Sequence, residues 1–164
     1  MNAKPPSRPK SPRTKEKQPN RKSSGSSSEI SRTIVDEIAQ LSGFSEYGIR
    51  QMVTRASEFG RALNQGQLKT NQIRKFLDAI NRVKAQVIEA GLGDDAEVLP
   101  VKIEGEIVLL KPKLAYAAAR QKAAIPLSKV MSAAIDKTIT FGDFNQLVQF
   151  IESVIAYHKA EGGE

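Results

Sequence analysis

The side chains that could do chemistry in this 164-residue chain are basic residues. Lys113 and Arg120 lie seven residues apart with Tyr116 between them, and Arg74 and Lys75 stand together earlier in the chain. Seven residues are nearly two helical turns, so Lys113 and Arg120 share one face of a helix. Such a face suits a phosphate backbone, because Lys and Arg bind phosphates while Tyr stacks or donates a hydrogen bond.

The residues of most catalytic and metal sites are missing. The sequence has no Cys and a single His, His158, which excludes disulfides, thiolate chemistry and His-rich metal centres. Asp94 and Asp95 follow a Gly and indicate a solvated turn rather than a metal site. His158 is in helical phase with Val154 and Ile155, which favours a packed or interfacial histidine over a general base. We therefore expect no enzyme activity, no metal and no cofactor.

The net charge is concentrated in residues 1–28. This stretch holds eight basic residues and one acid, Glu16, which gives +7, the formal net charge of the whole chain. It also holds five of the eight Pro and almost no apolar side chain, a composition that predicts a disordered tail. Such a tail adds nucleic-acid affinity by releasing counterions, or it serves only as a solubilising extension. Residues 29–164 are then a neutral domain.

Hydropathy argues against a membrane protein. No stretch approaches the ~18 apolar residues of a membrane span. No apolar core follows the basic N-terminal stretch, as a secretory signal would require. These observations predict a cytoplasmic protein with no membrane partner.

Apolar residues from residue 29 onward recur at helical spacing and predict an all-α compact bundle of five to six helices. The expected helices cover approximately residues 30–41, 45–64, 70–90, 112–120, 126–135 and 141–158. Thr70 is the expected N-cap of the third helix, and Gly91 its C-terminal stop. Thr140 and Asp143 form a near capping box for the last helix. Residues 92–108 break the pattern and predict a short hairpin or a loop.

The start of the third expected helix is a second place for an anion. Lys69 precedes it, where unpaired backbone N–H groups and the helix dipole favour negative charge, and Arg74 and Lys75 follow. The alternative is a solvated helix surface on which Arg74 pairs with Asp78, four residues further along. The residues alone leave both interpretations open.

Three segments, in this order, resemble the small subunit of type III-A CRISPR–Cas effector complexes, the Csm complex. They are LKTNQIRKF at residues 68–76, LKPKLAYAAAR at residues 110–120 and AYHK at residues 156–159. The resemblance covers roughly residues 68–160, and its specific parts are Thr-x-Gln-Ile-Arg and Lys-Pro-Lys-Leu-Ala-Tyr-Ala. It does not extend to the basic tail or to residues 92–108.

The resemblance implies a non-catalytic, RNA-binding structural subunit that acts in antiviral defence. Copies would self-associate along the crRNA and target RNA, between the large subunit and the repeating backbone subunits, through sugar-phosphate contacts. Nuclease and cyclic-oligoadenylate activities would belong to those other subunits. The RNA-binding residues it suggests are Lys69, Arg74, Lys75, Lys111, Lys113, Tyr116, Arg120 and Lys122, with Gln72 assisting.

The competing hypothesis is a helical, self-associating protein–protein interaction module that does not bind RNA directly. The long apolar stripes favour it, as does Lys84, which falls inside the apolar arc of the third expected helix and must extend to solvent or meet a partner. Under either hypothesis the expected core includes Phe76, Leu114, Phe144 and Ile151.

Overall fold

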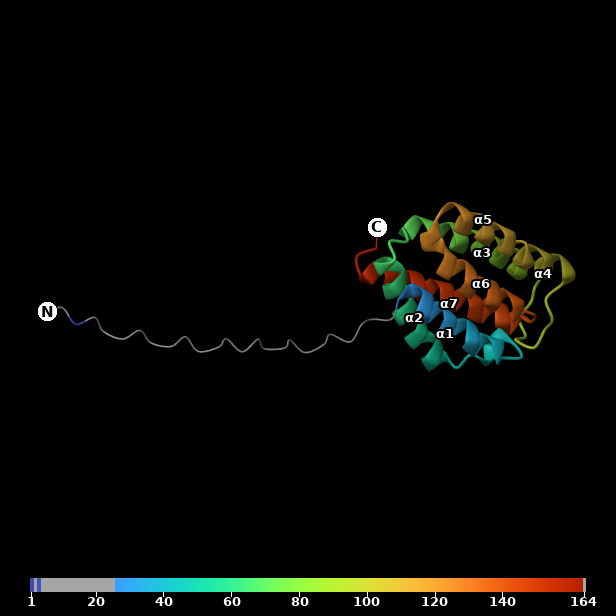
Figure 1. Ribbon diagram of the computed structural model, residues 1–164. Coiled ribbons are helices and arrows are strands. Elements are labelled where there is room, and N and C mark those ends of the chain that lie inside the picture. The colour runs from blue at the N-terminus through green and yellow to red at the C-terminus, as the bar shows by residue number, and fades with distance from the viewer. Residues whose placement is uncertain (2, 4–25, 164) are drawn as a thin grey trace.

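The computed structural model describes residues 1, 3 and 26–163, so the predicted disordered tail lies almost entirely outside the described residues. Within them the chain is helical (Figure 1), which confirms the predicted all-α fold. The helices are α1 Ser27–Ala39, α2 Ile49–Gln65, α3 Thr70–Glu89, α4 Val101–Val108, α5 Leu110–Arg120, α6 Ile125–Asp136 and α7 Phe141–Ala160. Two 3₁₀ turns, η1 at Phe44–Glu46 and η2 at Lys122–Ala124, complete the elements.

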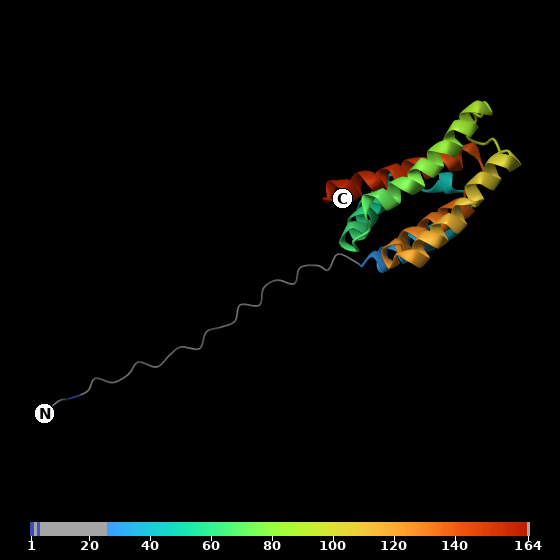
Figure 2. The same cartoon turned by 90° about the horizontal axis from the view of Figure 1, so that it is seen from above.

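The helices lie in two layers that are clearest from above (Figure 2). One layer contains α2, α3 and α7, while α1, α5 and α6 form the other, with α4 at its end. Within the first layer, α7 packs extensively on α2. Gly60 allows this close approach, because a Cβ atom there would lie 2.8 Å from the carbonyl oxygen of Val154.

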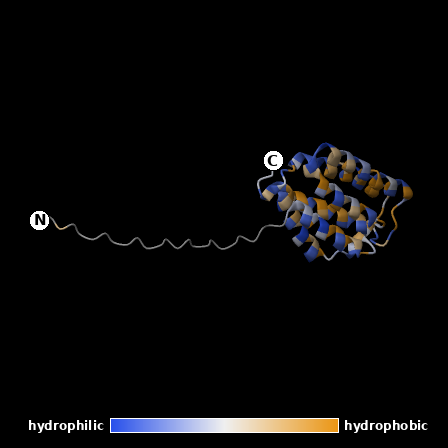
Figure 3. Cartoon of the chain, viewed as in Figure 1, coloured by the Kyte–Doolittle hydropathy of each residue, from blue (hydrophilic) through white to orange (hydrophobic). Residues whose placement is uncertain are grey.

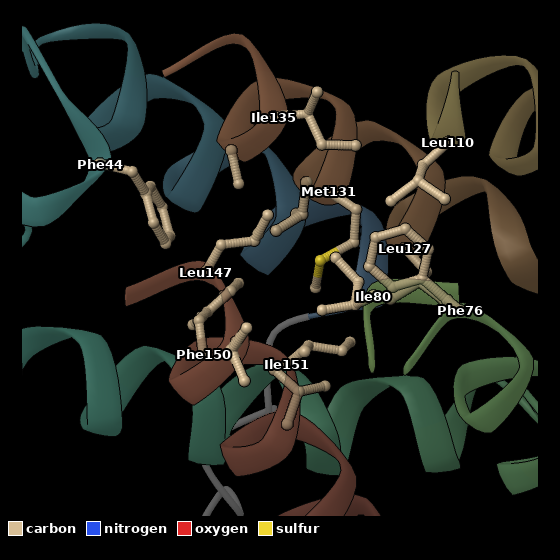
Figure 4. Close-up of a cluster of buried hydrophobic side chains, with 14 of the residues drawn as sticks. Phe44, Phe76, Ile80, Leu110, Leu127, Met131, Ile135, Leu147, Phe150 and Ile151 are labelled. Carbon is tan, nitrogen blue, oxygen red and sulfur yellow. The ribbon is translucent and has the colours of Figure 1, made fainter. Parts of the chain in front are cut away.

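The core forms where the apolar stripes of the two layers meet. Each helix carries hydrophilic and hydrophobic residues along its length (Figure 3), as amphipathic helices do. Phe76 and Leu114 are 7% and 5% exposed, and Phe144 and Ile151 are fully buried, which confirms the expected core. Figure 4 shows Phe76, Leu110 and Leu127 gathered at one side of this cluster. They come from α3, α5 and α6, so this side of the core joins the two layers.

The predicted ends of α7 and α3 are largely confirmed. The Thr140 hydroxyl accepts from the Asp143 N–H at 3.2 Å, while the Asp143 carboxylate accepts from the Thr140 N–H at 3.0 Å, a complete capping box. Gly91 follows α3 with φ of +72°, the left-handed conformation of a helix stop. Thr70 is the first residue of α3 and not its N-cap, because its hydroxyl contacts His158 instead.

Two other predicted helix starts are shifted. The helix expected from residue 45 begins at Ile49, because Phe44–Glu46 is a 3₁₀ turn and Tyr47 after it is extended. The Tyr47 ring is buried against Phe44 and Phe150. The helix expected from Pro112 begins two residues earlier, which leaves Pro112 in the first turn, where its missing N–H is tolerated.

The hairpin or loop predicted over residues 92–108 is a loop only as far as residue 100, and α4 occupies the rest. Ile103, Ile107 and Leu110 are buried at spacings of four and three, an amphipathic pattern that outweighs the turn signal of Gly105. The loop itself is attached to the α6–α7 connection. The Leu99 N–H donates to the Ile139 carbonyl at 3.0 Å.

Candidate nucleic-acid interface

A groove of about 530 Å³ lies between α3 and α5, and basic side chains border it. Lys75 and Arg82 enter from α3, and Lys113 and Arg120 from α5. Each pair is seven residues apart, so each helix presents its two cations on one face. The groove therefore has four cations in two facing pairs.

The fold places these cations by burying the residues next to them. On α3, Phe76 and Ile80 point into the core, which leaves Lys75 and Arg82 on the flank of the same helix. On α5, burial of Leu110 and Leu114 orients Lys113 in the same way. The apolar stripes therefore determine both the packing of the two helices and the positions of their cations.

The electrostatics of the groove are one-sided. No acidic residue is among its lining residues in the described part of the chain. Lys75, Arg82, Lys113 and Arg120 form no ion pair with any described residue. Arg82 only donates to the backbone carbonyl of Asp78, at 3.3 Å. Cations without an ion-pair partner can bind a polyanion directly, because no existing ion pair has to break first.

Tyr116 and Arg120 form a pair at the edge of the groove. The guanidinium carbon of Arg120 lies 5.7 Å from the centre of the Tyr116 ring, and Arg120 Nη1 donates to the Tyr116 hydroxyl at 3.3 Å. The Tyr116 side chain is 64% exposed. The cation–π contact thus orders an arginine while leaving both side chains accessible.

The structure brings together four of the eight residues named from the sequence: Lys75, Lys113, Tyr116 and Arg120. Lys69, Arg74 and Lys122 are exposed but do not line the groove. Lys111 is engaged elsewhere, because its Nζ lies 2.6 Å from the Asp136 carboxylate.

One cation of the groove, Arg82, is absent from that set, although the sequence carries a signal for it. Arg82 lies seven residues after Lys75, the same spacing that drew attention to Lys113 and Arg120. The ion pair expected in the surface alternative is absent, since none joins Arg74 to Asp78 among the described residues, although Arg74 does lie on the exposed helix surface. Gln72, expected to assist, also lines the groove.

His158 is a packed residue, as its helical phase predicted. It is fully buried, with Nε2 donating to the Leu68 carbonyl at 2.8 Å and Nδ1 3.2 Å from the Thr70 hydroxyl. Burial lowers the pKa of His158 from its ordinary value of 6.5, against the opposing effect of the hydrogen bond to Leu68. The ring therefore fastens α7 to the start of α3.

Asp94 and Asp95 also behave as turn residues. The Asp94 carboxylate accepts from the Ala96 N–H at 2.9 Å, and the Asp95 backbone carbonyl accepts from the Gly142 N–H at 3.0 Å. Among residues 26–163, no group of three or more His, Cys, Asp or Glu side chains is arranged to hold a metal ion.

Fold and groove together define a small all-α protein with a cationic groove between two helices. A family model described as Csm2 Type III-A matches residues 46–164, more than half of the chain. The protein belongs to this family, whose members are structural subunits of type III-A CRISPR effector complexes. No curated protein and no solved structure matches the chain significantly.

The match confirms the resemblance seen in the three segments, extends it toward the N-terminus through α2, and also spans residues 92–108, which the resemblance had left out. It also makes the other subunits of a type III-A complex the partners of this chain. None of the described helices is both long and apolar enough to cross a membrane.

Proposed function

We propose that this protein is the non-catalytic subunit that holds RNA in a type III-A effector complex, with the α3–α5 groove as its contact surface. The observation that carries the proposal is the convergence of four cations, none of them in an ion pair with a described residue, on a groove without acidic lining. Lys and Arg in this state bind the sugar-phosphate backbone irrespective of base sequence.

The proposed ligand is the crRNA together with its target RNA, along which several copies of the subunit stack. Lys75, Lys113 and Arg120 bind phosphates from the groove, and Tyr116 contributes a hydroxyl and an aromatic face. Lys69, Arg74, Lys111 and Lys122 are retained as peripheral contacts with smaller effects. The large subunit and the repeating backbone subunits are the proposed protein neighbours.

The test is charge reversal in the groove. The double variant Lys113→Glu with Arg120→Glu should lower the affinity for single-stranded RNA on the order of 100-fold, because two attractive contacts become repulsive. Fluorescence anisotropy with a labelled oligonucleotide measures this. The matched control is Arg50→Glu with Lys102→Glu, which changes the same charge at exposed positions outside the groove. Equal decreases of affinity in both variants would refute a specific role for the groove.

A protein–protein interaction module without direct RNA binding is the second candidate. Exposed apolar side chains at and near α4 favour it: Val101 is 83% exposed, Val98 65% and Leu109 56%. Such side chains are typical of contacts with another protein. A salt titration separates the candidates, because RNA affinity carried by phosphate contacts decreases steeply with salt. An RNA affinity that is absent, or independent of salt, would favour this second candidate.

A further inference from the structure

The floor of the α3–α5 groove is apolar, which phosphate contacts do not require. Phe76, Leu114 and Leu127 line the groove and are each at most 7% exposed, so they form its floor. Phe76 and Leu127 are both labelled at the same side of the core cluster in Figure 4, and both line the groove. Small side chains at Ala79 and Ala117 leave the space above this floor open. A phosphate gains nothing from such a surface, whereas a flat and largely apolar group does.

The edge of the groove carries groups that recognise bases. The exposed Tyr116 ring, held by Arg120, offers an aromatic and a guanidinium plane, both of which stack on unpaired bases. Gln72 lines the opposite wall with an amide that both donates and accepts hydrogen bonds. Neither the stacking planes nor the amide is needed to hold a phosphate backbone alone.

We propose that the groove takes up an unpaired RNA base, which packs on the apolar floor beside Tyr116 while the four cations bind the neighbouring phosphates. This inference rests on the proposed function and narrows its ligand to a strand with an unstacked base. The volume of about 530 Å³ lies within the range of roughly 300–1,000 Å³ of pockets that enclose small organic groups.

The charge of the edge favours RNA as the occupant over an apolar protein segment. An apolar helix would leave four cations without counter-charges, whereas a nucleotide brings a phosphate with each base. The remaining protein alternative is an acidic amphipathic segment. Such a segment would use the floor and the cations but would have no need of the exposed Tyr116–Arg120 pair.

The experiment fills the floor without changing any charge. In the full-length chain, Ala117→Leu places a larger side chain in the groove, and Ala119→Leu is the matched control at an exposed position of the same helix. Ala117→Leu should lower the affinity for a single-stranded RNA roughly tenfold, which is the scale of one base stack, and should leave the salt dependence unchanged. Ala119→Leu should bind as the wild type does.

A second variant and a second probe guard against misfolding of the filled groove. Tyr116→Ala, at an exposed position, should lower affinity several-fold, and Tyr116→Phe should restore most of it. The fluorescence of an RNA containing one 2-aminopurine should change on binding to the wild type and much less with either defective variant. A blunt RNA duplex of the same sequence should bind more weakly than the single strand.

The outcomes separate failure of the base-binding inference from failure of the proposed function. If Lys113→Glu with Arg120→Glu leaves RNA binding intact, the proposed function itself fails. If that variant weakens binding but Ala117→Leu and Tyr116→Ala do not, or if the duplex binds equally well, only the base-binding inference is overturned. A third outcome is that Ala117→Leu weakens binding of an acidic amphipathic peptide but leaves RNA affinity unchanged. This outcome would assign the apolar floor to a protein partner.

Discussion

Basic side chains on the α1–α2 face and in the α3–α5 groove belong to the same residue types but have opposite surroundings. Arg55 of α2 is enclosed by acids, with Nη2 2.5 Å from a Glu37 oxygen and Nη1 2.8 Å from Glu58. Lys75 and Lys113 in the groove have no acidic partner among the described residues. Residue type and net charge therefore do not distinguish a cation that is already paired within the fold from one that remains available to a ligand, whereas the ion pairs of the structure do.

The α1–α2 face is a structural network. Glu37 accepts from Arg55 and also from the Tyr47 hydroxyl at 2.6 Å, and Tyr47 is only 2% exposed. Burial raises the pKa of Glu37, but the hydrogen bonds from Arg55 and Tyr47 outweigh burial and lower it overall. This network joins α1, the segment after η1, and α2. Its charges are therefore already used within the fold.

The largest expected effect on stability comes from breaking this network. Glu37→Ala removes the acceptor of a buried Tyr47 hydroxyl and one partner of Arg55, which should lower the free energy of unfolding by about 2 kcal/mol. Glu58→Ala removes only the ion pair between Arg55 and the more exposed Glu58, and should lower the free energy of unfolding by about 0.5 kcal/mol. Urea denaturation measures both. RNA affinity should change less than about twofold, and a larger decrease of affinity would remove the distinction between the two regions.

A smaller effect on stability is expected when the pH is lowered, because the buried His158 side chain becomes protonated. His158 lies outside the groove, so this change concerns stability and not RNA contacts. The folded state disfavours the charged imidazole, so the unfolded chain takes up more protons as the pH decreases below 6.5. The stability that comes from keeping this imidazole neutral is therefore present above pH 6.5, and stability should decrease as the pH is lowered from 7.5 to 5.5. His158→Gln should abolish this decrease. An identical pH dependence in both proteins would show that His158 is not its source.

The smallest effects separate two lysines that the sequence alone does not distinguish. Lys75→Gln should weaken RNA binding a few-fold and reduce the slope of log affinity against log salt by about 0.7, the value of one single-strand phosphate contact. Lys111→Gln should change the slope much less, because the Lys111 ammonium pairs with Asp136. Its stability cost should stay below about 1 kcal/mol. Equal changes of slope would mean that the ion pair with Asp136 opens on RNA binding.

Much of the fold follows from helical periodicity. The stripe that ends with Val154 places His158 in the core, and Thr140 with Asp143 marks the start of α7. Periodicity is a less reliable guide near glycine, which is common both in turns and at helix ends. The Glu104-Gly105 pair suggests a turn where α4 continues, because burial of Ile103 and Ile107 compensates for one exposed Gly. Ile88 is 69% exposed although Val87, in the same last turn of α3, is 1% exposed, because Ile88 lies to one side of the buried stripe that ends at Val87.

The candidate site is only half predictable, for a physical reason. Spacing along one helix identifies Lys113 and Arg120 as neighbours, but only tertiary packing places them opposite Lys75 and Arg82 of α3. The partner of Lys111 is 25 residues away in sequence, on α6, so no local pattern reveals it. The apolar floor is likewise assembled from three helices, α3, α5 and α6.

The salt dependence of RNA binding is the most direct test of whether the α3–α5 groove is the RNA-binding surface. Neutralising the four groove cations (Lys75, Arg82, Lys113 and Arg120, each to Gln) should make the slope of log affinity against log salt shallower by about 3, because each phosphate that is no longer neutralised accounts for about 0.7. The control neutralises Arg32, Arg50, Lys102 and Lys129, which are exposed and outside the groove. We predict a large change of slope for the groove variant and a small one for the control. Equal slopes in the two variants would contradict the assignment of the groove as the RNA-binding surface.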